Sequence, residues 1–359
     1  MNTKIWKLIL PAILLMNACK KDDVVIPVTP VVSTAGVYAL SEGTFSSNNT
    51  RLAYYDFATG TVSGNIYNTA NSADLGDTGN DMIIYGSKLY IVMNVTSNVT
   101  VLNSENAKLI KKIDFKNGTI NKEPRYAVAA NGKVYVSAYD GSVSVIDTTT
   151  LTITKNITVG SNPEGLAIYG KYLYVANSGG LNFPAPPDST VSVIDLTTET
   201  EIKKVTVGPN PINVAANSTG DIYVGNYGVF GSINPQIYVI SGATNTFKTK
   251  LDTSLQYSHV RIYNDVAYLY NTYGGTGTCK LLDTKTNTIL RNEFIIDGTV
   301  VTNPYGINID DTNGDVYITD SKDFSSSGAV FCFDKTGKKK FSFSTTPGIS
   351  PNTIAFIRK

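Results

Sequence analysis

Few residues in this chain are of the types that catalyse reactions or bind metal ions. The sequence contains one histidine, His259, so no histidine cluster can ligate zinc or copper. A Ser-His-Asp site would depend on that one residue, and no nucleophile-elbow motif accompanies it. Segment 311–315, Asp-Thr-Asn-Gly-Asp, is similar in type to a calcium loop, but no Glu follows at the EF-hand distance and Asn-Gly is also a preferred hairpin turn. We therefore expect no enzyme, no metal site and no cofactor.

Amides, aromatic rings and charged groups are better represented, and they are suited to binding a ligand. Aromatic rings supply apolar contact area, in tyrosine together with a polar hydroxyl, and amides and charges pair with the polar edges of a ligand. The candidate ligand-binding residues are Asn80, Asp81, Arg125, Tyr126, Tyr139, Glu164, Asn177, Phe183, Asn226, Tyr227, Tyr273, Tyr305 and Asp320. Whether these residues meet depends on the elements that position them.

A tyrosine flanked by apolar residues recurs seven times along the chain, in a strand that we name B. The spacings between successive tyrosines are 52, 45, 39, 49, 45 and 49 residues, for Tyr38, Tyr90, Tyr135, Tyr174, Tyr223, Tyr268 and Tyr317. In all but the first unit, an apolar strand A and a turn with Gly or Asn precede strand B, and strands C and D follow it. Four-stranded units of this period are typical of β-propeller blades.

The two ends of the repeat complement each other. The first unit begins at strand B, and the C-terminal segment 351–356 has the pattern of a strand A without partners. We therefore predict an all-β fold over residues 36–359: a seven-bladed β-propeller with four-stranded antiparallel blades. The C-terminal strand would join the first blade and close the ring, which removes exposed sheet edges. No continuous helical periodicity or second domain is evident after the N-terminal leader.

The propeller geometry predicts where the candidate residues gather. The D-to-A links and the B-to-C loops emerge on one face of the disc, which we call the top face, and the short hairpins emerge on the bottom face. The B-to-C loops vary in length and carry many of the aromatic and amide candidates. The first two residues of each strand A should ring the mouth of the central channel, and they differ chemically from blade to blade. This variety favours an asymmetric ligand, although the mouth of any propeller channel is polar and wet.

Several segments resemble known propeller families. Leu173–Asn177 (LYVAN) and the strands 143–147 and 191–195 resemble the repeat of the YVTN-type, YncE-like propellers. Segment 74–86, leading into Leu89–Ile91, more narrowly resembles a group of surface lipoprotein propellers that includes the cobalamin-capturing BtuG proteins. The similarity covers about residues 36–359. It implies a seven-bladed propeller that captures cobalamin or another corrinoid.

The N-terminus is typical of an export signal. Lys4 and Lys7 flank the start of an apolar run that is too short to span a bilayer and ends just before Cys19. This pattern resembles a bacterial lipoprotein signal, which implies a signal peptide at 1–18, lipidation of Cys19 and a tether at 19–35. The alternative is an ordinary signal peptide with an incidental cysteine. The acidic pair Asp22-Asp23 resembles the tag of lipoproteins that face the cell exterior from the outer membrane.

These observations together predict a lipid-anchored surface protein that binds a ligand on the top face. The resemblance favours a corrinoid, delivered to a TonB-dependent outer-membrane transporter. A protein- or glycan-binding adhesion propeller is the main alternative, since it would use the same face. A nucleic-acid-binding propeller is less favoured, because 30 basic and 29 acidic residues give a net charge of +1 and no basic stripe is present.

Overall fold

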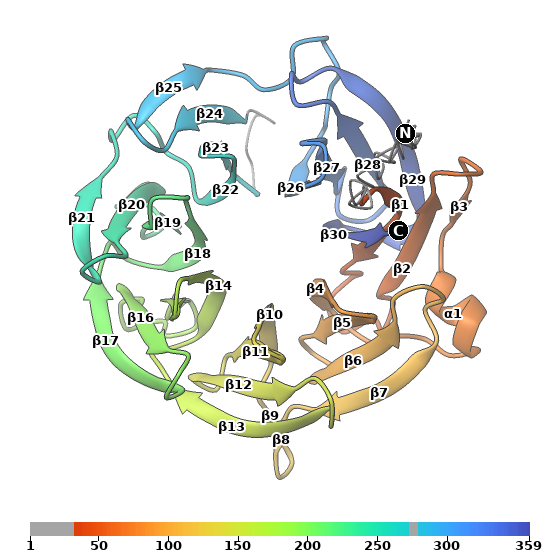
Figure 1. The fold of residues 1–359 in the computed structure, drawn as a ribbon, viewed down its shortest axis with the longest axis horizontal. Coiled ribbons are helices and arrows are strands. Elements are labelled where there is room, and N and C mark those ends of the chain that lie inside the picture. Colours follow the sequence, from red (N-terminus) through yellow and green to blue (C-terminus); the bar gives the residue numbers. More distant parts are fainter. Residues whose placement is uncertain (1–31, 273–278) are drawn as a thin grey trace, which may run out of the picture. The chain divides into compact units, whose positions relative to one another are not determined.

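The computed structural model describes residues 32–272 and 279–359, and residues 33–359 form one compact unit. Within this unit seven four-stranded antiparallel sheets are arranged in a ring around a central channel (Figure 1). Strand A of each sheet lies next to the channel and strand D lies at the rim. The predicted seven-bladed β-propeller is confirmed.

The blades follow each other around the ring in chain order. In the order A to D, blade 1 consists of β30 (Pro351–Arg358), β1 (Thr34–Ser41), β2 (Arg51–Asp56) and β3 (Val62–Ser63), and blade 2 of β4 (Gly79–Tyr85), β5 (Lys88–Met93), β6 (Asn98–Asn103) and β7 (Leu109–Asp114). Blade 3 consists of β10 (Pro124–Ala130), β11 (Lys133–Ala138), β12 (Ser142–Asp147) and β13 (Thr152–Thr158), and blade 4 of β14 (Pro163–Tyr169), β15 (Tyr172–Asn177), β16 (Thr190–Asp195) and β17 (Thr200–Thr206). Blade 5 consists of β18 (Pro211–Ala216), β19 (Asp221–Asn226), β20 (Gln236–Ser241) and β21 (Thr246–Lys250). Blade 6 consists of β22 (His259–Tyr263), β23 (Val266–Tyr270), β24 (Lys280–Asp283) and β25 (Thr288–Arg291), and blade 7 of β26 (Pro304–Ile309), β27 (Val316–Asp320), β28 (Ser327–Phe333) and β29 (Lys339–Ile349).

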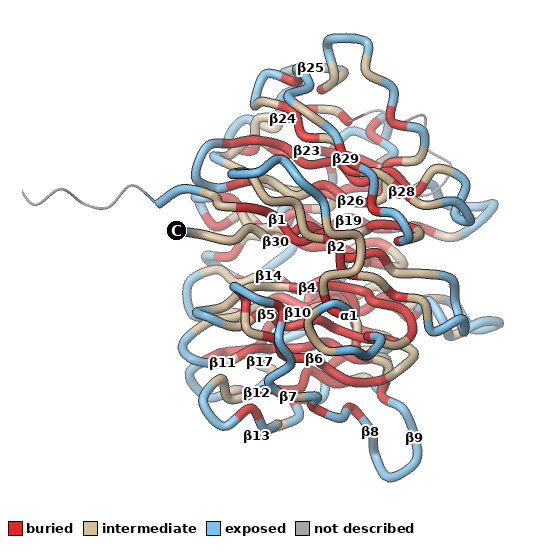
Figure 2. The backbone as a smooth tube through the Cα atoms, turned by 90° about the vertical axis from the view of Figure 1, so that its right-hand side faces the viewer, coloured by how far each residue is buried: buried red, intermediate tan, exposed pale blue. Residues whose placement is uncertain are grey.

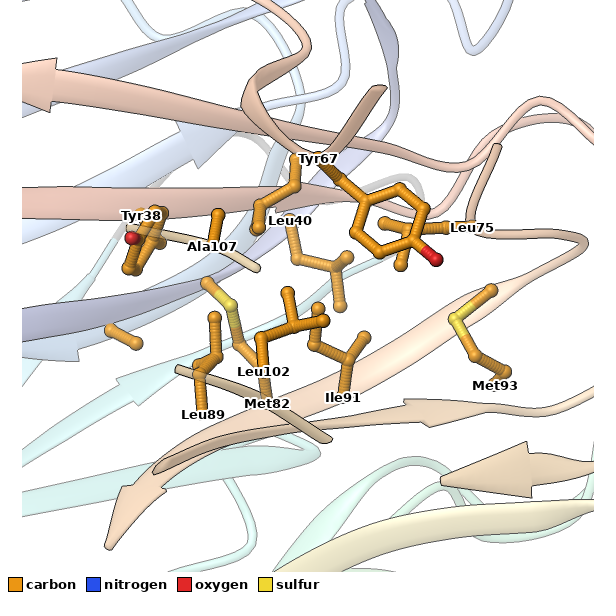
Figure 3. Packing of buried hydrophobic residues seen from close by; sticks show 12 residues of the cluster. Tyr38, Leu40, Tyr67, Leu75, Met82, Leu89, Ile91, Met93, Leu102 and Ala107 are labelled. Carbon is orange, nitrogen blue, oxygen red and sulfur yellow. The ribbon is translucent and has the colours of Figure 1, made fainter. Parts of the chain in front are cut away.

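The core consists of the apolar faces of neighbouring blades. Figure 3 shows one of these interfaces, where Leu40 of blade 1 packs with Met82, Leu89 and Ile91 of blade 2. These side chains alternate along their strands with residues that face the other neighbouring blade, so each sheet contributes to two interfaces. The alternation of apolar residues on both faces is why the strands are recognisable in the sequence.

The repeated tyrosines join neighbouring blades at the bottom face. All seven are buried in strand B. The Tyr38 hydroxyl donates to the carbonyl oxygen of Ser104 over 3.0 Å, and the Tyr174 hydroxyl donates to Asn245 Oδ1 over 2.6 Å. In both cases the acceptor lies in the C-to-D turn of the next blade. The recurring tyrosine therefore fills the interface between blades, and in blades 1 and 4 its hydroxyl also bonds across it.

Two of these tyrosines differ in their hydroxyl contacts, which gives a matched test. The Tyr223 hydroxyl lies 2.7 Å from the Thr284 carbonyl oxygen and 2.6 Å from Asn287 Oδ1, whereas the buried Tyr90 hydroxyl has no hydrogen-bond partner among the described residues. We expect Tyr223→Phe to lower the free energy of unfolding by about 1–2 kcal/mol and Tyr90→Phe to leave it unchanged or raise it. Urea denaturation of both variants checks this, and equal losses would contradict the assigned bonds.

The C-terminal strand closes the ring as predicted. β30 pairs antiparallel with β1, with Ala355 opposite Tyr38 and Thr353 opposite Leu40. Ser33 and Lys359 exchange two backbone hydrogen bonds of 3.1 and 3.0 Å. Figure 2 shows this end of the unit on the face opposite the β8–β9 hairpin (Lys116–Asn117 and Ile120–Asn121), which lies in a D-to-A link. Both ends of the propeller therefore lie on the bottom face.

Two small elements were not expected from the sequence. The β8–β9 hairpin extends the link between blades 2 and 3, and the helix α1 (Ile66–Asn71) follows the two-residue strand β3. Asn65 caps α1 by accepting a hydrogen bond from the Asn68 N–H, and Tyr67 anchors it in the core between blades 1 and 2. A helix of six residues is too short to produce a recognisable helical periodicity.

No helix within the described part of the chain is long and apolar enough to cross a membrane. The predicted signal peptide at 1–18 and Cys19 lie outside the described residues, so the lipid anchor stays a prediction.

Candidate functional site

A polar cavity of about 190 Å³ lies at the mouth of the central channel on the top face. Its walls come from blades 1, 2, 3, 5, 6 and 7, through the starts of strands A and the adjoining B-to-C loops. The lining residues are Glu42, Asn80, Arg125, Tyr126, Asn213, Tyr227, His259, Arg261, Tyr270, Thr272, Tyr305, Gly306, Asn352 and Thr353. A second cavity of about 210 Å³ continues into the channel and includes Asp81.

Proline starts strand A in five of the seven blades, at Pro124, Pro163, Pro211, Pro304 and Pro351. Proline at the first position of a strand costs little, because its missing N–H lies at the end of the hydrogen-bond ladder. The residue that follows is then at the channel mouth in three of these blades, as Arg125, Tyr305 and Asn352. The position after the proline therefore places chemically different side chains at the same cavity.

The largest group of charges at the mouth is centred on Arg125. Its Nε donates to Glu164 Oε2 over 2.9 Å, and the Tyr139 hydroxyl donates to the other carboxylate oxygen of Glu164. The Arg125 guanidinium lies 4.8 Å from the ring centroid of Tyr139 and 5.8 Å from that of Tyr126. Burial acts to lower the pKa of Arg125, but Glu164, Tyr139 and Tyr126 together outweigh it and raise the pKa, so the guanidinium stays charged. The arrangement holds Arg125 in one orientation.

Asp81 lies deeper in the channel and links two blades. Its Oδ2 accepts the Ala127 N–H over 2.9 Å, and Asn213 Oδ1 accepts the Val260 N–H in the same way between blades 5 and 6. The cations that face Asp81 are Arg261 on β22 and Arg125 on β10. Burial raises the pKa of Asp81 to about 6, although the Ala127 N–H and the Arg261 guanidinium act in the opposite direction.

Asp81 should make the stability of the protein depend on pH. Its pKa is about 6 in the folded protein and 3.8 by itself, so folded chains keep a proton that unfolded chains release between these values. The free energy of unfolding should fall by about 3 kcal/mol as pH rises through this range. Above about pH 6 the Asp81 carboxyl should cause no further change. Asp81→Asn keeps the acceptor for Ala127 and removes the charge, so we expect it to be more stable than the parent at neutral pH.

Urea denaturation at about pH 4 and about pH 7.5 measures both proteins. The stability difference between them should be large at the higher pH and small at the lower one. An Asp81→Asn variant that is less stable than the parent at neutral pH would mean that the ionised carboxylate is stabilising.

His259 contributes a neutral ring to the cavity wall. Its Nδ1 lies 2.9 Å from the Ser258 hydroxyl, and its ring packs against Tyr227 and Tyr270 at centroid distances of 5.7 and 5.1 Å. Burial and, to a smaller extent, the nearby Arg261 lower the pKa of His259 to about 3. The imidazole is therefore uncharged near neutral pH.

Glu42 and Tyr305 form the side of the mouth where blades 7 and 1 meet. The Tyr305 hydroxyl donates to Glu42 Oε2 over 2.8 Å. Burial raises the pKa of Glu42, while this hydrogen bond and Arg125 lower it. Next to them, Asn352 donates from its side-chain amide to the carbonyl oxygens of Gly79 and Asn80 and so links blades 1 and 2.

The structure brings together about half of the residues predicted to bind a ligand. Those that line the two channel cavities are Asn80, Asp81, Arg125, Tyr126, Tyr227 and Tyr305. Glu164 and Tyr139 lie behind Arg125, and Tyr139 faces a separate surface groove between blades 3 and 4. Phe183 is 91% exposed on its loop, away from the cavity. Tyr273 lies outside the described residues.

Three predicted residues lie at the buried ends of strands B, which corrects the prediction that they belong to the B-to-C loops. Asn177, Asn226 and Asp320 occupy the last position of strand B in their blades and are 0–2% exposed. Asn177 Oδ1 accepts the Gly160 N–H, and Asp320 accepts the N–H groups of the link before β26. The Asn226 amide likewise bonds carbonyl oxygens of the link before β18. These hydrogen bonds hold the D-to-A links in place, so the three side chains have structural roles within the fold.

Sequence reasoning left several lining residues out of the candidate set. They are Glu42, Asn213, His259, Arg261, Tyr270, Thr272, Gly306, Asn352 and Thr353. Four of these, Asn213, His259, Gly306 and Thr353, align with Asp81 and Tyr126 in the repeat, so their place in the repeat was a usable signal. Arg261 lies further along β22, where a charge in an inner strand is unusual and was itself informative.

No cluster of three or more His, Cys, Asp or Glu side chains in residues 32–272 and 279–359 is arranged to hold a metal ion. Segment 311–315 forms a turn in which the preceding Asp310 accepts the Thr312 N–H and ion-pairs with Arg358.

Fold and cavity together define a seven-bladed β-propeller with a polar site at the mouth of its channel. Residues 35–348 match DUF5074, described as a domain of unknown function, and the chain belongs to this family. No curated protein matches the sequence.

Similar solved structures include three chains from different sources. Hydrazine synthase of Kuenenia stuttgartiensis is 20% identical, with a TM-score of 0.57 over 72% of this chain and 76% of that chain. A quinoprotein alcohol dehydrogenase-like protein of Bacteroides thetaiotaomicron is 13% identical, with a TM-score of 0.64 over 90% and 78%. The computationally designed Ika8 protein is 13% identical, with a TM-score of 0.55 over 89% and 90%. At these identities the likeness concerns the fold alone.

Proposed function

We propose that this protein binds a ligand in the cavity at the channel mouth and acts by binding rather than by catalysis. The observation that carries the proposal is the convergence of chemically unlike side chains from six blades on one polar space. A purely structural mouth would need only small residues repeated from blade to blade. Concave sites with a few convergent polar groups are the usual form of small-molecule sites.

A corrinoid is the ligand that we propose first. The basis is the resemblance of segment 74–86 to the cobalamin-capturing surface propellers, together with the amides of Asn80, Asn213 and Asn352 around the mouth. A corrinoid carries amide groups around its edge, and each buried amide needs partners. The cavity is much smaller than a corrinoid, so the ligand would lie across the top face and insert one edge.

We further propose that the protein is a lipoprotein of the outer membrane, anchored through Cys19, and that it delivers its ligand to a TonB-dependent transporter. The chain enters the propeller at Ser33 on the bottom face, opposite the cavity. An anchor at that end would leave the top face accessible to ligand and partner. Membrane retention of a Cys19→Ala variant would count against the anchor.

Calorimetry with purified protein and cobalamin tests the proposed ligand. We expect binding, and we expect Tyr227→Ala and Tyr305→Ala each to weaken it by about one to two decades, since a lost buried polar contact costs about 1–3 kcal/mol. Asn131→Gly is the bottom-face control, because Asn131 has a φ of 52°, which glycine adopts without strain. Absence of binding to cobalamin and related corrinoids would refute this ligand, and an effect of the control alone would refute the assigned face.

A second candidate is a protein- or glycan-binding role for the long B-to-C loops of blades 4 and 5. These loops expose Leu181 and, almost completely, the rings of Phe183 and Phe230. Exposed aromatic rings on neighbouring loops are typical of interaction surfaces. Substitution of Phe183 and Phe230 by serine would impair this role and leave ligand binding in the cavity unchanged.

A further inference from the structure

We propose that the cavity at the channel mouth receives a negatively charged oxygen group of its ligand, a carboxylate or a phosphate, on the outer edge of Arg125. This inference concerns the same cavity as the proposed function and depends on that cavity being the binding site, but it does not depend on the ligand being a corrinoid. It specifies the chemical group that the site selects.

The hydrogen bonds of Arg125 leave one edge of its guanidinium available. Nε donates to Glu164, and no residue in the described part of the chain accepts a hydrogen bond from Nη1 or Nη2. Arg125 nevertheless lines the cavity, and its side chain is 18% exposed. Unpaired N–H groups in the wall of a cavity can donate hydrogen bonds to a bound ligand.

The orientation of this edge is held from three sides. Glu164 binds Nε, Tyr139 and Tyr126 lie against the guanidinium, and Tyr139 also bonds Glu164. An arginine fork held in this way matches the two oxygens of a carboxylate or phosphate and loses little side-chain entropy on binding. A lysine could provide the charge at this position but could not provide two parallel donors.

The charges around the cavity favour one additional anion. Glu164 is 8% exposed and already paired, and a second guanidinium, Arg261, also lines the mouth. The remaining carboxyl groups are Glu42 and Asp81, and burial raises the pKa of both. These two groups take up a proton more readily than ordinary carboxylates, so an entering anion can be accommodated by neutralising one of them.

Three small probes of similar size test the proposal directly. Ligand-observed NMR with propionate, methyl phosphate and propionamide compares two anions with a neutral amide. We expect propionate or methyl phosphate to bind at least about tenfold more tightly than propionamide, because hydrogen bonds between ionised partners are stronger. Equal binding of propionamide and the anions would overturn the inference.

Variants of Arg125 separate recognition by the fork from general attraction. Arg125→Lys keeps the charge and should weaken anion binding about tenfold or more. Arg125→Gln alone would leave the buried Glu164 carboxylate without its cation. The double variant Arg125→Gln/Glu164→Gln keeps the pair neutral and hydrogen-bonded, and it should abolish anion binding in a folded protein. Lys171→Gln removes a cation that pairs with Asp195 on a bottom-face hairpin and should have no effect. Unchanged anion binding in Arg125→Lys and in the double variant would overturn the proposal.

The anion-binding experiments and the cobalamin experiment can fail independently of each other. Binding of propionate without binding of cobalamin would support the anion site and refute the corrinoid. Binding of cobalamin that is unaffected by the Arg125 variants, with no preference for anions among the probes, would support the corrinoid and refute the anion site.

Discussion

Deletion of residues 351–359 should open the ring and abolish cooperative folding or lower the thermal midpoint by well over about 10 °C. The deletion removes β30, which supplies the inner strand of blade 1 and also contacts β4 and β26 on either side. Ile354 and Ala355 are 3% and 5% exposed, so the neighbouring blades lose apolar contacts as well as the hydrogen bonds of the strand. The exposed edge of β1 would also promote aggregation.

A circular permutant gives the matched control for this deletion. Ser33 and Lys359 are hydrogen-bonded neighbours, so a short glycine linker from Lys359 to Ser33 would turn β30 and β1 into an ordinary A-to-B hairpin. The permutant begins in the link before β30 and contains every strand. It should melt close to the parent protein in calorimetry, whereas the deletion variant should not. A deletion variant as stable as the permutant would show that β30 is dispensable for closure.

Gly306→Ala should be the most damaging single substitution at the channel mouth. A Cβ atom on Gly306 would lie 1.9 Å from the carbonyl oxygen of Asn352, which is part of the backbone of β30 and cannot rotate away. The inner strands of blades 7 and 1 would have to separate. We expect a loss of about 3 kcal/mol or more in the free energy of unfolding and a clear decrease in ligand affinity, because both residues line the cavity.

Gly180→Ala is the control for the methyl group itself. The nearest atoms to a Cβ at Gly180 lie at 3.5 and 3.8 Å, which are ordinary contact distances, and the residue is in a surface loop. Its stability should stay within about 0.5 kcal/mol of the parent protein. If the two variants unfold at the same urea concentration, blades 7 and 1 are not packed as closely as the structure indicates.

The architecture could be predicted from the sequence because each blade is encoded locally. A strand with a buried tyrosine, apolar alternation on both faces and Gly or Asn turns recurs in every unit, and each of these features acts within a few residues. Closure followed from the same local pattern, since an inner strand missing at the start of the repeat was present at residues 351–356. The helix α1 and the β8–β9 hairpin were missed because elements this short leave no periodicity.

The sequence by itself therefore determined the blades, their number and the closure of the ring, together with the face on which the candidate residues gather. Only the tertiary structure decided which residues meet. Asn177 and Arg261 are both polar residues in strands, yet Asn177 bonds the link before β14, while Arg261 donates from Nε to the Ile307 carbonyl oxygen and also lines the channel cavities. Whether a polar side chain is satisfied within the fold or left for a ligand depends on groups far away in the chain, and the packing of all seven blades brings those groups within bonding distance.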